Sequence, residues 1–180
     1  MTFTVLRERV RFRGRVLTLV DRDVVLPNGR RTRLHIVDHP GAVAVVPVFP
    51  NGDVLLLSQF RLAAGGEILE IPAGTREPGE APRRTAQREL AEETGHRAGR
   101  LTKLAEFFTA PGFCTELMTV YLGRDLVPAR AEGDPDEVLR PRRTPFRAAL
   151  RMIERGLIRD AKTIAGLYLA ERHLHRRNAT

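Results

Sequence analysis

The stretch GTREPGEAPRRTAQRELAEETG, residues 74–95, carries the strongest indication of the fold in this sequence. Its first part, residues 74–81, is rich in glycine and proline, which is typical of a loop. Pro82 follows where a helix can begin, and Gly95 stands where the same helix can end. The stretch therefore predicts a loop that leads directly into a short helix.

This helix carries several acidic side chains on one side. At about 100° per residue, Glu89 and Glu93 fall almost above one another, and Glu92 lies about a quarter-turn away. Ala86 and Leu90 point to the adjoining face, which we expect to pack on the core. The acidic side chains are therefore expected at the rim of the core.

Three carboxylates within a turn and a half of helix repel one another, which disfavours the helix unless a positive charge compensates them. A divalent cation is one such charge. Oxygen donors without His or Cys among them favour a hard cation, Mg²⁺ or Mn²⁺, of the kind that binds phosphate oxygens. The alternative for any single acid is a solvated helix face that pairs with Arg83, Arg84 or Arg88.

The spacing of these residues resembles the signature box of the Nudix hydrolases. That box runs Gly, five residues, Glu, seven residues, Arg-Glu, an aliphatic residue, one residue, Glu-Glu, one residue and Gly. Every one of these positions is filled here, by Gly74, Glu80, Arg88, Glu89, Leu90, Glu92, Glu93 and Gly95. His96 replaces the aliphatic residue that usually follows, a departure that bears on helix packing more than on metal binding. The resemblance implies the Nudix fold, an α/β (α+β) arrangement with a mixed β-sheet sandwiched between helices.

The resemblance also implies roles for the box residues. Glu89 and Glu93, aided by Glu92 and by the main-chain carbonyl of Ala73, are expected to hold Mg²⁺, for which Mn²⁺ could substitute. Arg88 is expected to orient the acids. In that scheme the metal ions neutralise phosphate oxygens and lower the pKa of a bound water.

The segment before the box, Glu-Ile-Pro-Ala-Gly at residues 70–74, resembles the ADP-ribose pyrophosphatase-like branch of the family. This implies an enzyme that cleaves a nucleoside diphosphate linked to a sugar, most simply ADP-ribose to AMP and ribose 5-phosphate. Hydrolysis of another nucleotide sugar, such as ADP-glucose or GDP-mannose, is an alternative within enzymology. A Nudix module that senses a nucleotide without cutting it, and the processing of RNA caps or ends, are alternatives of other classes.

Three residues outside the box are candidate substrate ligands by the same resemblance. Arg61 ends a Gln-Phe-Arg phrase that we place just after a strand, and its alternative is a surface arginine beside an edge strand. Glu116 follows a Pro-Gly-Phe loop and is expected at the metal or terminal-ribose site. Glu70 is expected either to bind adenine or ribose groups or to pair with an arginine.

The segment ARAEGDPDEV, residues 129–138, is polar and aperiodic and is expected to be a loop that closes over substrate. In the family branch that this chain resembles, a loop at this place supplies the glutamate that deprotonates the attacking water. Glu137 is our first choice for this general base, with Glu132, Asp134 and Asp136 left open. The alternative is a disordered acidic loop that has no catalytic role.

The regions on either side of the box read as strands and then helices. Residues 16–26 and 31–37 flank Pro-Asn-Gly, a strong hairpin signal, and residues 43–49 and 54–57 are apolar runs expected to form buried strands joined by a turn. We expect residues 1–40 to be a dimerisation segment and residues 41–180 the Nudix domain, because the resemblance implies a homodimer. Thr144 is expected to cap one C-terminal helix, with Pro145 as its first residue, and Asp160 to cap another.

Composition limits the remaining function classes. The chain has 180 residues, of which 42% are hydrophobic, enough for one ordinary globular domain. Its formal net charge of +8 comes from arginines spread along the chain, so we expect attraction of small anionic substrates rather than nucleic acid binding. Cys114 is the single cysteine, and no apolar run is long enough to cross a membrane, which favours a cytoplasmic protein. Gly-rich loops ending in Gly-Lys-Ser/Thr, His-Glu-x-x-His motifs and nucleophile elbows are absent from the sequence.

Overall fold

A computed structural model describes residues 2–131, 133 and 138–178 of the chain. Its contacts divide the chain into two compact units. The first consists of Met1–Gly41 with Phe107–Met118, and the second consists of Ala42–Glu106 with Thr119–Thr180. Among the described helices, none combines the length and the apolar character that crossing a membrane requires.

The N-terminal part of the first unit is an antiparallel sheet in the order β1-β2-β3, formed by Thr4–Arg13, Thr18–Val25 and Arg31–Asp38. The expected hairpin is confirmed, because β2 pairs with β3 and Gly29 in the turn between them has a φ of 80°. Glycine adopts that left-handed conformation without the steric cost that a side chain brings. Strand β1 extends the hairpin to three strands, and its residues are exposed.

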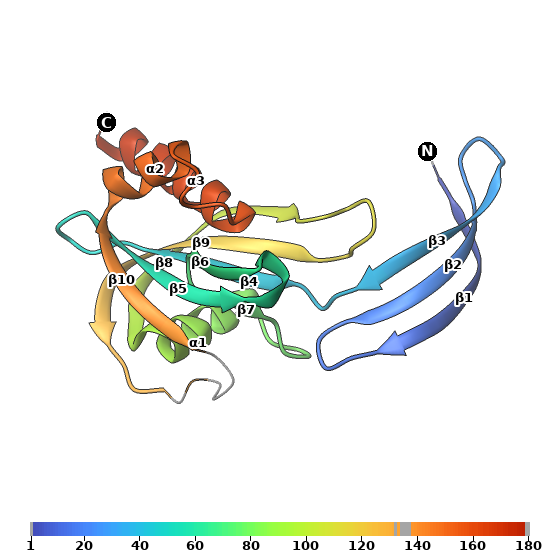
Figure 1. The fold of residues 1–180 in the computed structure, drawn as a ribbon, viewed down its shortest axis with the longest axis horizontal. Coiled ribbons are helices and arrows are strands. Elements are labelled where there is room, and N and C mark those ends of the chain that lie inside the picture. Colours follow the sequence, from blue (N-terminus) through green and yellow to red (C-terminus); the bar gives the residue numbers. More distant parts are fainter. Residues whose placement is uncertain (1, 132, 134–137, 179–180) are drawn as a thin grey trace. The chain divides into compact units, whose positions relative to one another are not determined.

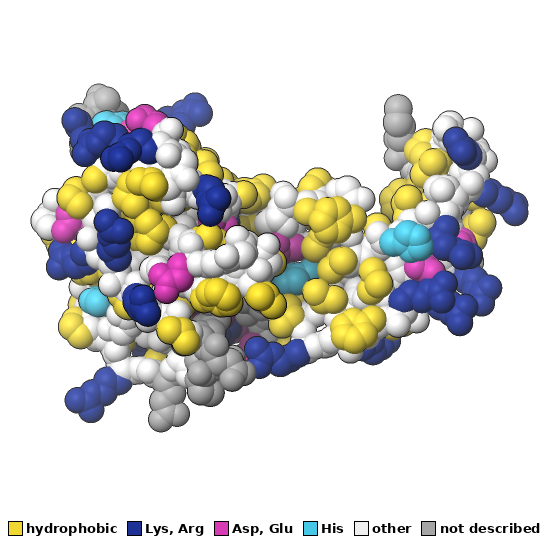
Figure 2. Space-filling view, viewed as in Figure 1, with side chains coloured by type: hydrophobic (Ala, Val, Ile, Leu, Met, Phe, Trp, Pro, Cys, Tyr) yellow, Lys and Arg dark blue, Asp and Glu magenta, His cyan; other side chains and the backbone are white. Residues whose placement is uncertain are grey.

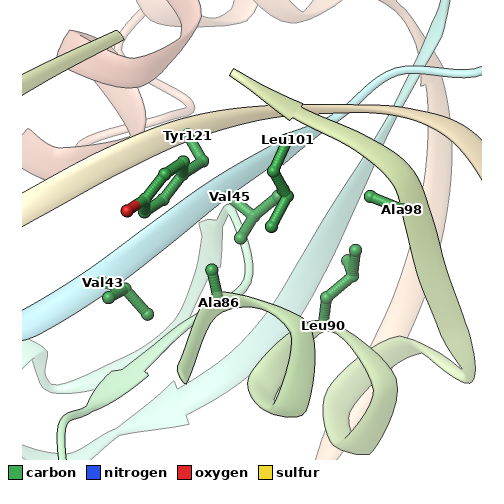
Figure 3. Close-up of a cluster of buried hydrophobic side chains, with 7 residues drawn as sticks. All are labelled: Val43, Val45, Ala86, Leu90, Ala98, Leu101 and Tyr121. Carbon is green, nitrogen blue, oxygen red and sulfur yellow. The ribbon is translucent and has the colours of Figure 1, made fainter. Parts of the chain in front are cut away.

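The core of the second unit is built on β4 (Ala42–Pro47), whose residues are all buried. On one side, Val43 and Val45 pack against Ala86 and Leu90 of α1 (Pro82–Thr94), as Figure 3 shows. On the other side Val46 packs against α3 (Ala161–Asn178) at Gly166, where a Cβ would lie 3.1 Å from the Val46 side chain. A strand covered on both faces must be apolar throughout, which is why residues 43–49 form a nearly continuous apolar run.

Figure 1 shows α1 on one side of the strands of this unit and α2 with α3 on the other, so the predicted sandwich of sheet between helices is confirmed. Two sheets contribute to it, in the orders β7-β4-β9-β8 and β10-β5-β6. The remaining elements are β5 (Asp53–Arg61), the short 3₁₀ helix Leu62–Ala64, β6 (Gly66–Glu70), β7 (Ala73–Thr75), β8 (His96–Phe108), β9 (Leu117–Pro128), β10 (Leu139–Pro145) and α2 (Phe146–Glu154).

One strand prediction was wrong in detail, and one strand was not predicted. The Gln59-Phe60-Arg61 phrase lies inside β5 rather than after a strand, because Gln59 pairs with Leu139 and with Ile68 on the two neighbouring strands. Strand β10 itself was not predicted, since its arginines and its two prolines argue against a strand. The prolines are tolerated because β10 is at the edge of its sheet, where a missing N–H breaks no ladder on the open side.

The capping prediction held for one C-terminal helix and failed for the other. The backbone N–H of Thr163 donates to Asp160 Oδ2 over 2.9 Å, so Asp160 caps α3 as predicted. Thr144 does not cap α2, because it pairs with Val54 in the β10–β5 ladder and its hydroxyl is buried there. Pro145 takes the cap position instead, and no side chain bonds to the end of the helix there.

Candidate active site

Helix α1 presents the acidic residues, and its ends are those that the sequence predicts. Pro82 is its first residue, and Gly95 closes it with a φ of 68° and an N–H bond to the Ala91 carbonyl of 2.9 Å. The Gln87 side chain also ties α1 to β8, donating to the Ala98 carbonyl over 2.6 Å and accepting from the Ala98 N–H over 3.1 Å. The acidic face is therefore attached to rigid structure at the helix end and along its length.

Arg88 lies among three glutamates of the box. Its Nη1 donates to Glu89 Oε1 over 2.8 Å and to Glu92 Oε2 over 3.0 Å. Its Nε and Nη2 donate to the two carboxylate oxygens of Glu80 over 3.2 Å and 3.0 Å. The bond to Glu80 is the main reason why the pKa of Arg88 is raised, and the charge of Glu89 and the bonds to Glu89 and Glu92 add to it, while burial opposes them. One guanidinium therefore offsets repulsion among three carboxylates.

Glu89 lies directly against the backbone of Gly74 in β7. A Cβ built on that glycine would come within 2.0 Å of the Glu89 Cδ and Oε1 atoms. No side chain can be fitted at that distance, so only glycine at position 74 leaves the carboxylate where it is. This close approach explains why the box begins with glycine in this chain.

Glu93 lies beside the same strand and is 7% exposed. The Ala73 N–H donates to Glu93 Oε2 over 3.0 Å, and Ala73 pairs with Ala44 of the central strand. The structure therefore brings Glu89, Glu93 and the Ala73 main chain together, although Ala73 lies twenty residues before Glu93. That the Ala73 carbonyl is a metal ligand stays a prediction.

The donor set at this place fits a hard cation. Its side chains are carboxylates, and Glu89 is seated in a space that a Cβ at position 74 would fill. Within the described part of the chain, no three His, Cys, Asp or Glu side chains are already arranged as a cation site. Three of the box acids contact Arg88 instead, so its guanidinium supplies the positive charge among them.

A pocket of about 550 Å³ adjoins this cluster on the side of the Arg88 and Glu92 side chains. Arginine and glutamate side chains both line it, so the pocket presents groups of both charge signs. The residues around it are Glu77, Pro78, Gly79, Glu80, Arg84, Gln87, Arg88, Ala91, Glu92, Arg97 and Ala131.

Arg61 and Glu70, two predicted substrate ligands, contact each other. Arg61 donates from Nε to Glu70 Oε1 over 2.7 Å and from Nη2 to Oε2 over 2.9 Å. Glu70 is only 2% exposed, and Lys162 also contacts its Oε2. Burial pushes the pKa of Glu70 upward, but the bond from Arg61 and the charge of Lys162 outweigh it and leave that pKa lowered. Glu70 thus pairs with an arginine, which is one of its two expected roles.

Glu116, the third predicted substrate ligand, lies in the first unit. Thr109 Oγ1 donates to its Oε2 over 2.6 Å, and His39 Nε2 lies 3.7 Å from its Oε1. His39 is fixed in turn, because its Nδ1 accepts the Gly41 N–H over 3.1 Å. Within that unit the carboxylate is therefore oriented by two neighbours that sequence spacing did not indicate. Its role toward substrate stays a prediction.

The predicted general base, Glu137, lies outside the described residues, as do its alternatives Glu132, Asp134 and Asp136. Gly133, from the same segment, is described. A Cβ on it would lie 3.2 Å from the Glu92 carbonyl oxygen, so this residue lies beside the C-terminal turns of α1. The assignment of the base stays a prediction.

Comparison with known proteins shows the family to which this chain belongs. A sequence profile of the NUDIX domain matches residues 38–167, which is most of the chain. The chain belongs to the Nudix hydrolase family. Members of this family generally need divalent metal ions, in agreement with the oxygen donors around α1.

Individual relatives cover nearly the whole chain. This Nudix hydrolase is 43% identical over 162 residues to an ADP-ribose pyrophosphatase of Bacillus subtilis (strain 168), covering 89% of this chain and 87% of the relative. It is 40% identical over 163 residues to a methanol dehydrogenase activator of Bacillus methanolicus, covering 89% and 88%. A crystal structure of an ADP compounds hydrolase matches with a TM-score of 0.87 and 26% identity, covering 100% of this chain and 98% of that one.

The Nudix site gives an expected dependence of stability on pH. Glu80 has a lowered pKa, mainly because of the bond from Arg88, and the ordinary value for its carboxyl group is 4.5. A lowered folded-state pKa contributes stability that is complete above about pH 4.5 and is lost as the pH falls through the folded-state pKa. We therefore expect the free energy of unfolding in urea to decrease as the pH falls below about 4.5.

A Glu80→Gln variant provides the control for that measurement. It removes one of the titrating groups, so its free energy of unfolding should fall less steeply over the same pH range. Equal slopes for the two proteins would show that Glu80 does not have the lowered pKa that its contact with Arg88 produces.

Proposed function

We propose that this Nudix hydrolase cleaves the diphosphate of a nucleoside diphosphate sugar, converting ADP-ribose and water to AMP and ribose 5-phosphate. The observation that carries the proposal is the intact acidic cluster, with Glu89 seated on Gly74 and Glu93 bonded to the Ala73 N–H. A relative that this chain matches over 87% of the relative's length bears the name ADP-ribose pyrophosphatase. An enzyme of this specificity therefore accounts for both the site and the likeness.

In this proposal the chain's own residues prepare the site for a divalent cation. Glu89, Glu93 and Glu92, with the Ala73 carbonyl, would hold Mg²⁺, or Mn²⁺ in its place. Bound there, the ion supplies positive charge to phosphate oxygens and makes a water more acidic. Arg88 keeps the carboxylates together before the ion arrives, since it contacts three of them.

The remaining catalytic task is to remove a proton from the attacking water. We assign it to Glu137, with Glu132, Asp134 and Asp136 as alternatives in the same segment. A carboxylate of ordinary pKa suffices, because the water would already be acidified. What supports this segment is Gly133, which lies beside the main chain of Glu92.

Substrate recognition is assigned to Arg61 and Glu116, with Glu70 acting through Arg61. The side chain of Arg61 is 39% exposed and is oriented by two bonds to Glu70, so it presents a fixed positive group to an anion. Positive side chains occur at several places on the surface, as Figure 2 shows, and their field also attracts a small anionic substrate.

The test is product identification. The purified protein would be incubated with Mg²⁺ and, separately, with ADP-ribose, ADP-glucose, GDP-mannose and capped RNA, and the products identified by mass. We expect AMP and ribose 5-phosphate from ADP-ribose, and no products once a chelator has removed the metal. Preferred cleavage of GDP-mannose would keep the reaction type and change the substrate. Absence of any product would favour the nucleotide-sensing alternative.

We further propose that the protein is a homodimer joined through its N-terminal sheet. Exposed large hydrophobic side chains gather in this segment, and such surfaces mark interaction sites. They are Phe3, Val5, Leu6, Val10, Phe12, Val16, Leu17 and Leu34. Analytical ultracentrifugation should then give twice the chain mass of 20.2 kDa, and Leu6→Asp should shift it toward one chain. A wild-type mass of one chain would contradict the proposal.

A cytoplasmic location belongs to the same proposal. It rests on cysteine usage, since Cys114 is the single cysteine and a reducing compartment needs no disulfides. Fractionation of cells that express the protein, followed by immunoblotting, would test it. Recovery in a secreted fraction would contradict it.

A further inference from the structure

Lys162, in the first turn of α3, contacts a carboxylate 92 residues away in the sequence. Its ammonium lies against Glu70 Oε2 and is 3.1 Å from Asp160 Oδ2. Its side chain is 14% exposed, whereas Lys103, the other lysine of the chain, is 51% exposed. A lysine buried to this extent between two carboxylates differs from one that extends into solvent from a surface.

The backbone around Lys162 is held in register with the segment that contains Glu70. Asp160 Oδ2 accepts the Thr163 N–H over 2.9 Å, which fixes the first turn of the helix. Thr163 Oγ1 in turn accepts the N–H of Ile71, the residue after Glu70, over 2.9 Å. The first turn of α3 is therefore bonded to the chain next to Glu70, so the contact between Lys162 and Glu70 does not depend on a flexible segment.

Glu70 links this helix turn to Arg61. Glu70 is buried and Arg61 is partly exposed, so the buried carboxylate holds the arginine in place, and the arginine is the member of the pair that a ligand can contact. A contact through both Nε and Nη2 fixes the plane of the guanidinium as well as its distance. Movement of the Glu70 carboxylate would consequently rotate or shift the guanidinium of this partly exposed side chain.

A second cation at Glu70 has a physical reason. Taking a carboxylate out of water is unfavourable, and a single partner that is itself partly in solvent compensates it only in part, because water screens that attraction. The Lys162 side chain is 14% exposed, against 39% for Arg61, so its attraction to Glu70 is screened less. Asp160 lies beside the same ammonium, so Lys162 stands between two carboxylates.

We propose that Lys162 is a positioning residue, which fixes the Glu70 carboxylate and thereby the orientation in which Arg61 meets the diphosphate sugar. This inference rests on the proposed function, in which Arg61 contacts the substrate. Lys162 itself need not touch the substrate. Its loss should therefore weaken substrate binding through Arg61 and leave the residues around α1 unaffected.

The first measurement compares KM and kcat for ADP-ribose in wild type, Lys162→Met, Arg61→Met and Lys103→Met. Loss of a charge-assisted contact in Arg61→Met should raise KM about 10- to 100-fold. Lys162→Met should raise KM about fivefold with kcat changed less than about twofold, and Lys162→Arg should restore most of the loss. Lys103→Met, the matched control on β8, should match wild type.

Two further measurements separate positioning from general damage to the fold. In an Arg61→Met background, Lys162→Met should raise KM by less than about 1.5-fold, because its effect passes through Arg61. The NMR signal of the Arg61 Nε–H, identified by its loss in Arg61→Lys, should broaden or exchange faster with solvent in Lys162→Met. Should Lys162→Met fail to fold by circular dichroism, Lys162→Gln keeps a donor to Glu70 without the charge, and the same changes are expected from it.

Each remaining outcome counts against the inference in a distinguishable way. An unchanged Arg61 signal in the Lys162 variants would show that Lys162 does not hold the arginine. A rise in KM of the same size with and without Arg61 would show that Lys162 acts by another route. An Arg61→Met protein with wild-type KM, or a wild type without turnover, would overturn the substrate role of Arg61 or the proposed function, and this inference with it.

Discussion

Glu89→Gln is expected to lower kcat for ADP-ribose hydrolysis by about a thousandfold or more, which corresponds to the several kcal/mol that a bound metal ion contributes to a transition state. The amide keeps the shape of the side chain but lacks the charge that a hard cation needs. The same substitution at Glu93 should act similarly, since its carboxylate lies beside the Ala73 main chain. Turnover measured at saturating substrate and Mg²⁺ gives the result.

The fold should survive Glu89→Gln. The amide oxygen can still accept from Arg88, and Glu80 and Glu92 continue to compensate that guanidinium. Removing one of three crowded negative charges also lessens repulsion on the helix. The thermal unfolding midpoint should therefore change by only a few degrees.

Glu154→Gln is a suitable control for that experiment. Glu154 is an exposed acid at the end of α2, in the same unit and in the same type of element as Glu89. Its substitution removes the same charge from the protein and should leave kcat unchanged. Wild-type turnover in Glu89→Gln would remove this residue from the metal ligands and with it the main support for the mechanism.

The helix that carries the site could be predicted because its signals are local. Pro82 and Gly95 mark its ends, and the period of Ala86 and Leu90 marks its buried face, so each feature follows from residues within the helix segment itself. The fixed spacing of the box likewise placed Glu89, Glu92 and Glu93 on one side of this helix. Local pattern was therefore sufficient for the acidic face.

Contacts between segments that are distant in the sequence could not be predicted from local patterns. Glu70 meets Lys162 only because α3 returns across the sheet, and no periodicity in either segment indicates the partner of the other. Thr144 carried a local capping signal, but pairing of β10 with β5 took precedence over it. Strand β10 was also missed because its prolines argue against a strand. They are permitted because β10 is an edge strand, and its edge position depends on the order of the whole sheet rather than on the segment's own sequence.

Gly74 depends on both local pattern and distant contacts. The box predicts a glycine at this position, and the structure shows that its missing side chain leaves room for the Glu89 carboxylate. Gly74→Ala is expected to lower kcat by about a hundredfold, the scale of an active-site group displaced by about 1 Å. The new Cβ would occupy the position 2.0 Å from the Glu89 Cδ, so the carboxylate has to move. Local overpacking should cost about 1–3 kcal/mol in the free energy of unfolding, which urea titration would measure.

Gly66→Ala is the matched control for Gly74→Ala, because it adds the same methyl group in β6, a strand of the same unit, where a Cβ would meet no atom within 4 Å beyond the adjacent residues. It should leave kcat unchanged. Shortening the displaced acid should also relieve the clash, so Gly74→Ala with Glu89→Asp should recover at least about tenfold in kcat over Gly74→Ala alone. If Gly74→Ala lost activity equally with Glu or Asp at position 89, the loss would arise elsewhere than in the contact between Gly74 and Glu89. Recovery, by contrast, would show that the glycine is needed for the room it leaves to one carboxylate.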